Sequence, residues 1–125
     1  MKKIKITIKD IVLYGELYDT ETARAIARML PFDGSPEEWG DEFYFEIPVE
    51  MPLDKSATTK VKVGDIGYWP PGNALAIFFG PTPISKGFDP VPASDVNLVG
   101  KIVGDATLLS RAKGARTINI ERVPE

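Results

Sequence analysis

The side chains of this chain that could carry out acid–base chemistry are carboxylates, because two of the usual catalytic residue types are missing. The 125 residues include no histidine and no cysteine. This composition excludes zinc enzymes, serine–histidine hydrolases and cysteine nucleophiles. A general base would have to be a carboxylate whose pKa is raised by burial. Glu46 is the candidate, with Glu16 or Glu50 beside it, although Glu46 also alternates with apolar neighbours as the solvated face of a strand does.

A second group of residues could bind a ligand rather than react, and it surrounds the apolar run Ala74 to Phe79. Tyr68, Trp69 and Asn73 precede this run, and Thr82 follows it. A few polar groups among aromatic walls are typical of a small-molecule pocket. We therefore predict a cleft beside this run. The alternative is that the same side chains only seal one end of a barrel.

The overall composition favours one domain spanning residues 1–125. A chain of this length with 43% hydrophobic residues can bury an ordinary core. The net charge of −3 disfavours nucleic acid and anionic membranes as partners. No apolar run approaches the ~18 residues of a membrane span, and the first nine residues alternate too strictly for a signal peptide. We expect a cytoplasmic protein.

Hydrophobic patterning predicts a chain made mostly of strands. Segments of strand length recur at residues 2–8, 11–18, 43–49, 60–63, 65–69, 74–79, 96–103 and 117–123. Residues 32–42 and 80–95 are rich in turn formers and are predicted as loops. This count and the frequent turns are typical of a sandwich or closed barrel.

Two segments have helical features. Ala23, Ile26, Ala27 and Leu30 follow the helical period, after Asp19 or Thr20 as the N-cap and before Pro31 as the stop. A shorter helical piece is expected at residues 105–112. Because only these two segments could serve as crossovers, a parallel βαβ fold is disfavoured.

The order of these elements resembles the cyclophilin fold, and in particular the small bacterial and archaeal cyclophilin-like proteins, which are known mainly by their fold. "ALAIFFG" stands where cyclophilins carry a strand with paired phenylalanines, and "NLVGKIVGD" resembles their "VFGKV" strand followed by a helix. "GYWPPGNALAIFFGPTP" is typical of the smaller family. The resemblance implies a mainly β fold, a closed eight-stranded barrel capped by two helices.

The resemblance also raises the question of prolyl isomerase chemistry. Cyclophilins use an arginine directed at the prolyl nitrogen, a supporting glutamine, and phenylalanines with a histidine nearby. In this chain no arginine lies between Met29 and Ser110, and glutamine and histidine are absent. The strand that resembles the arginine-bearing segment offers Phe45 or Glu46 instead. The conventional isomerase site is therefore disfavoured, while an apolar pocket remains.

We thus expect a barrel that binds a proline-containing peptide or a small molecule, with no cofactor and no metal. The predicted ligand-binding residues are Phe45, Glu46, Met51, Tyr68, Trp69, Asn73, Phe79 and Thr82. The alternative is an atypical peptidyl-prolyl cis–trans isomerase or another enzyme that uses carboxylates. A third hypothesis is an interaction module that uses an exposed barrel rim or the acidic loop. The carboxylates of this loop could bind calcium, but they lack the spaced ligand pattern of an EF-hand, so ordinary solvation is favoured; they are Glu37, Glu38, Asp41 and Glu42.

Overall fold

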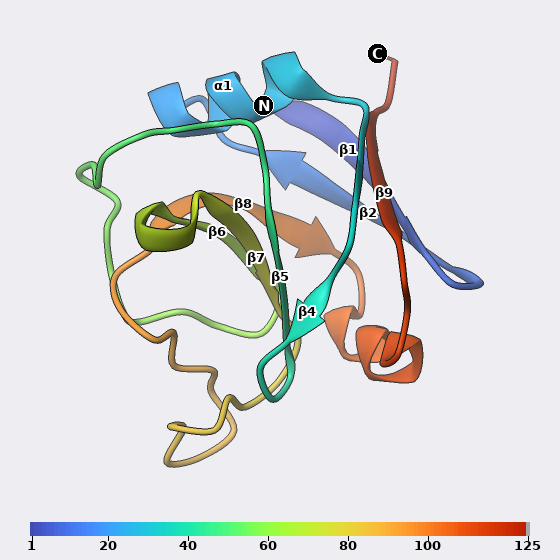
Figure 1. The fold of residues 1–125 in the computed structure, drawn as a ribbon, viewed down its shortest axis with the longest axis vertical. Coiled ribbons are helices and arrows are strands. Elements are labelled where there is room, and N and C mark those ends of the chain that lie inside the picture. The colour runs from blue at the N-terminus through green and yellow to red at the C-terminus, as the bar shows by residue number, and fades with distance from the viewer. Residues whose placement is uncertain (125) are drawn as a thin grey trace.

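The computed structural model describes residues 1–124 as a curled antiparallel β-sheet with one α-helix packed against it (Figure 1). The elements are β1 (Lys2–Ile8), β2 (Ile11–Leu17), α1 (Glu21–Met29), β3 (Phe32–Gly34), β4 (Glu37–Glu38), β5 (Glu42–Glu46), β6 (Asp65–Trp69), the 3-10 helix η1 (Pro70–Gly72), β7 (Ala74–Phe78), β8 (Asn97–Val103), the 3-10 helix η2 (Ala106–Ala112) and β9 (Ile118–Arg122). The mainly β fold expected from the sequence is confirmed.

The sheet does not close by hydrogen bonding, which corrects the expectation of a closed, eight-stranded barrel. The described residues form nine strands in the order β3-β9-β1-β2-β8-β6-β7-β5-β4. The two edge strands, β3 and β4, are separated in the chain only by Ser35 and Pro36. β3 pairs with β9, and β4 pairs with β5. A single chain segment, predicted as a loop, therefore bridges the gap between the two sheet edges covalently.

The first hairpin and the helix form where local sequence signals place them. β1 pairs with β2, and the last pair before the turn is Ile8 with Ile11. Lys9 in the turn adopts a positive φ of 52°. The Thr20 hydroxyl accepts a hydrogen bond of 3.1 Å from the Ala23 backbone amide and caps α1. The second predicted helix is present as η2, which has the tighter 3-10 geometry. Within the described part of the chain, no helix is long and apolar enough to cross a membrane.

The sheet buries apolar side chains on both of its faces. The concave face and α1 enclose the main core, which includes Ile6, Ile26, Phe43 and Ile77. A second, smaller cluster lies on the outer face and consists of Val61, Ala76, Phe78 and Val96, with Tyr44, Trp69 and Leu98 packed against it. β7 contributes to both clusters, so all five of its residues are buried. This double burial explains the continuous apolar run in its sequence.

Candidate functional site

The outer face of the sheet is hollowed above β7. Ala76 pairs with Tyr44 of β5, and Ala74 pairs with Trp69 of β6. Because paired residues of antiparallel strands lie on the same face, the two alanines lie between two large aromatic side chains. A methyl group fills little of the space between them. The hollow therefore follows from the sizes of side chains on three adjacent strands.

The proline-rich segment of residues 80–96 covers one side of this hollow. Pro92, Ala93 and Val96 line it from that segment. The Trp69 indole Nε1 donates a hydrogen bond of 2.7 Å to the Ser94 hydroxyl, which ties the segment to the sheet. Trp39 lines the hollow from the turn between β4 and β5.

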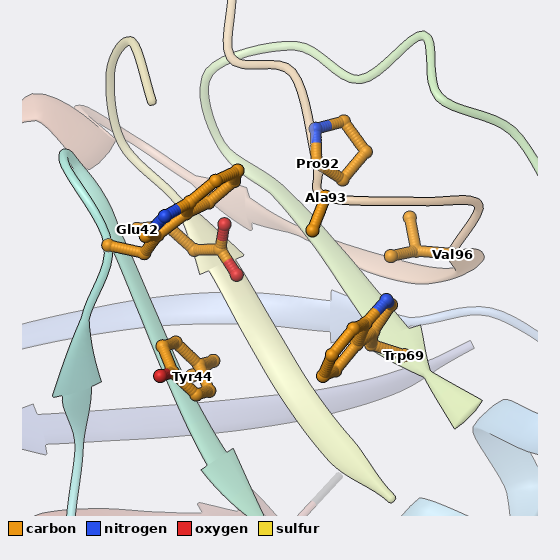
Figure 2. A pocket seen from close by; sticks show the side chains of 7 residues that line it. Glu42, Tyr44, Trp69, Pro92, Ala93 and Val96 are labelled. Carbon is orange, nitrogen blue, oxygen red and sulfur yellow. The ribbon is translucent and has the colours of Figure 1, made fainter. Parts of the chain in front are cut away.

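Together these groups form a pocket of about 240 Å³, lined by Trp39, Glu42, Tyr44, Trp69, Pro92, Ala93 and Val96. Figure 2 shows the Glu42 carboxylate and the Tyr44 and Trp69 rings around one common space, with Pro92 and Ala93 on the remaining side. Pockets for drug-sized ligands begin at about 300 Å³. The volume therefore suits a small ligand or one side chain of a larger one.

Glu42 supplies the carboxyl group of this pocket. The residue is 7% exposed, and its Oε1 atom has no hydrogen-bond partner. Burial in apolar surroundings raises the pKa of Glu42 from 4.5 to about 7. A buried polar atom without a partner costs free energy and often marks a functional position. At neutral pH this carboxyl can therefore hold or release its proton.

Of the eight residues predicted from sequence, Trp69 lines this pocket. Phe45 and Phe79 lie in the main core, where Phe79 packs on Phe43 with ring centroids 4.8 Å apart. Tyr68 is fully buried, and its hydroxyl donates a hydrogen bond of 2.6 Å to the Val49 carbonyl oxygen. These three predicted side chains therefore face the core, whereas Trp69 faces outward because alternate residues of a strand point to opposite faces.

The other four predicted residues lie apart from the pocket wall. Glu46 is exposed at the end of β5. Met51 and Asn73 line a separate, shallow depression near η1, and Asn73 ends that helix with a positive φ of 47°. Thr82 is buried, and its hydroxyl is hydrogen-bonded to the Ser85 hydroxyl. It therefore stabilises the conformation of the proline-rich segment.

Sequence reasoning assigned two pocket residues to a different role. Trp39 and Glu42 fall in the segment predicted as an acidic surface loop. A local signal for Glu42 was present, since it alternates with Phe43 and shares a strand face with Tyr44. The acidic residues do not gather as a calcium site would require: Asp41 pairs with Lys113 at 2.6 Å, and the described residues contain no cluster of three carboxylates suited to a metal.

The profile of the cyclophilin-like family matches residues 2–121, which is nearly the whole chain. The chain belongs to the cyclophilin-like family. The solution structure of a hypothetical protein from Archaeoglobus fulgidus is 35% identical, with a TM-score of 0.81 over 98% of this chain and 95% of that one. This cyclophilin-like chain therefore has an archaeal relative of unassigned function with the same fold.

A more distant solved structure shares only the fold of this cyclophilin-like chain. It is that of McbB in complex with tryptophan, which is 18% identical and superposes with a TM-score of 0.70. The match covers 98% of this chain but 45% of McbB. The chain matches none of the curated protein sequences.

Proposed function

We propose that this cyclophilin-like protein binds a small molecule, or one side chain of a peptide, in the pocket between Glu42, Tyr44 and Trp69. The observation that carries this proposal is the Oε1 atom of Glu42, which is buried without a hydrogen-bond partner in an otherwise apolar pocket. A ligand with a donor or a positive charge beside this carboxyl group would lower that cost on binding. The polar end of the ligand would therefore lie beside the Glu42 carboxyl group.

The remaining lining supports a ligand with an apolar or aromatic body. Trp39, Tyr44 and Trp69 offer ring surfaces, and Pro92 and Val96 add aliphatic contacts. Such rings bury large areas at low cost in side-chain entropy. McbB, which shares the fold, was solved with tryptophan bound, and this supports a ligand of comparable size and amphiphilic character.

The prolyl isomerase alternative gains less support from the geometry. Cyclophilin-type catalysis needs a donor directed at the prolyl nitrogen. All five arginines of the chain are exposed, and no arginine lines the pocket. A proline ring would also pack against the aromatic wall, so a proline-containing peptide would bind in this pocket without being isomerised.

Both tryptophans of the chain line the pocket, which makes the test specific. Isotope-labelled protein would be titrated with neutral aromatic amphiphiles such as indole and phenol, with small amines and with Xaa-Pro peptides. We expect the two indole Nε1–H resonances to shift saturably with at least one of these classes. The proposal fails if neither indole resonance responds to any class. Faster cis–trans exchange of a peptide at substoichiometric protein would instead establish an isomerase.

A further inference from the structure

We infer that the group recognised by this pocket is an alkylated ammonium, tertiary or quaternary, held between the Glu42 carboxylate and the faces of Tyr44 and Trp69. This inference rests on the proposed function and specifies its ligand. Three properties of the pocket carry it: the sign of its charge, the type of its rings and the number of its hydrogen-bond acceptors.

The charge of the lining favours a cation over an anion. Glu42 carries the one carboxyl group among the lining residues, and none of the described lysines or arginines lines the pocket. The ion pairs of the described residues join Asp19, Glu121 and Asp41 to their partners and leave Glu42 out. An anionic ligand would place a second negative charge beside a buried carboxyl group, whereas a cation supplies the missing partner.

The rings favour a cation as well. The faces of tryptophan and tyrosine attract cations through their negative quadrupole potential, and the attraction is strongest where water is excluded. Figure 2 shows the Tyr44 and Trp69 rings on two sides of the space that the Glu42 carboxylate enters. A cation at this position would therefore favour the ionised form of the Glu42 carboxyl group and would lie beside the rings of Tyr44 and Trp69.

The small number of acceptors favours alkylation of the nitrogen. A primary ammonium carries three N–H donors, and each donor needs an acceptor once it is buried. The carboxyl oxygens of the pocket both belong to Glu42 and lie on one side of it, so the three donors of a primary ammonium, which point in different directions, cannot all reach them, while another part of the wall is the aliphatic surface of Pro92, Ala93 and Val96. A tertiary ammonium has a single donor and a quaternary one has none. The alkyl groups of either would pack against that aliphatic wall.

The test compares choline with 3,3-dimethylbutan-1-ol, which has nearly the same shape and no charge. Both are titrated into the full chain, and binding is followed by tryptophan fluorescence and by the indole Nε1–H resonances of Trp39 and Trp69. We expect choline to bind at least about tenfold more tightly than the alcohol. Equal affinity of the two probes would overturn the inference and leave the proposed function intact.

Variants separate the pocket from general electrostatics. Glu42→Gln keeps the size of the side chain and removes its charge, so the advantage of choline should fall to about twofold or less. Asp95→Asn makes the same change of net charge at an exposed position of the neighbouring segment and should retain the full advantage. An equal loss in both variants would overturn the inference. Binding of indole without any binding of choline would also overturn the inference but would leave the proposed function intact. If no probe gave any response, both the inference and the proposed function would be wrong.

Two further comparisons keep the test informative if Glu42→Gln does not fold. Trp69→Phe preserves a ring face and should bind choline more tightly than Trp69→Leu by about tenfold; equal affinities would overturn the inference.

A peptide with trimethyllysine, measured beside the same peptide with lysine, shows whether the cation comes from a free metabolite or a protein side chain. Preference for unmodified lysine over its trimethylated form would contradict the predicted alkylation.

Discussion

The Trp69 indole Nε1 donates a hydrogen bond of 2.7 Å to the Ser94 hydroxyl, although the two residues are 25 positions apart in the chain. Trp69 ends β6 on the sheet, whereas Ser94 lies in the proline-rich segment next to the lining residue Ala93. The bond therefore connects the sheet side of the pocket to the segment that covers it. The shape of the pocket depends on this attachment.

Ser94→Ala should loosen the covering segment without unfolding the protein. The lost hydrogen bond is exposed to solvent, so we expect the free energy of unfolding to fall by about 1 kcal/mol or less. The Trp69 indole Nε1–H resonance should move, and acrylamide should quench Trp69 fluorescence more strongly. Ser110→Ala, at an exposed position of η2, serves as the control. Identical quenching in the two variants would contradict a role for the Trp69–Ser94 bond.

Glu42→Gln should remove a pH dependence of stability. The pKa of Glu42 is raised to about 7 in the folded protein from its ordinary 4.5, so the folded state binds the proton more tightly than the unfolded chain. The stabilising contribution of Glu42 is therefore fully present below about pH 4.5 and is lost as the pH rises through about 7. This loss lowers the free energy of unfolding by about 3 kcal/mol in total. The wild-type free energy of unfolding should therefore fall between pH 5 and 8 by more than that of Glu42→Gln.

Urea unfolding of the wild type and of Glu42→Gln at several pH values measures this difference directly. Asp95→Asn is again the matched control, because it removes an exposed carboxylate near the pocket. Its pH profile should parallel that of the wild type. Parallel profiles for the wild type and Glu42→Gln would show that Glu42 ionises normally in the folded protein.

Tyr68→Phe should affect stability rather than the pocket. The Tyr68 hydroxyl donates a hydrogen bond of 2.6 Å to the Val49 carbonyl oxygen and accepts one of 3.2 Å from the Met51 amide. Removal of the hydroxyl leaves these backbone groups without their partner, and we expect a loss of about 1–3 kcal/mol in urea unfolding. The Trp69 indole Nε1–H resonance should stay in place; a large shift would connect Tyr68 to the pocket after all.

Gly100→Ala should be strongly destabilising because two strands approach closely there. A Cβ atom at Gly100 would lie 2.2 Å from the backbone carbonyl oxygen of Glu16 on β2, which cannot move aside as a flexible side chain could. We expect a loss of about 3 kcal/mol or failure to fold. Gly87→Ala is the control, since a Cβ there meets nothing within 4 Å, and its melting temperature should match the wild type. Similar melting temperatures for both variants would contradict this packing.

Local patterning was sufficient for much of the fold. The alternation of Ile4, Ile6 and Ile8 predicted β1, and the helical period with Asp19 or Thr20 as cap predicted α1, whose cap is Thr20. The apolar run Ala74 to Phe79 predicted a strand covered on both faces, which β7 is. These predictions succeed because each depends on residues a few positions apart. The shortest strands, β3 and β4, escaped prediction because two or three residues cannot display a period.

The pocket shows what patterning could not supply. Trp69 was predicted to bind a ligand and lines the pocket, whereas Glu42 and Trp39 were assigned to a solvated loop. Alternation indicates that Glu42 and Tyr44 share one face of a strand, but it carries no information about which distant segment covers that face. The segment that covers this face comprises residues 80–96, whose apolar side chains follow neither a strand period nor a helix period.

The sequence by itself thus determined the longer strands, the helix and the family of this protein, because local periodicity and family motifs are properties of contiguous residues, whereas the strand expected at residues 60–63 is absent from the structure. Only the tertiary structure decided that the barrel stays open at β3 and β4 and that Glu42 is buried. Both features depend on contacts between segments far apart in the chain. Burial in turn determines the pKa of Glu42, so the chemistry of the pocket follows from tertiary packing rather than from residue type.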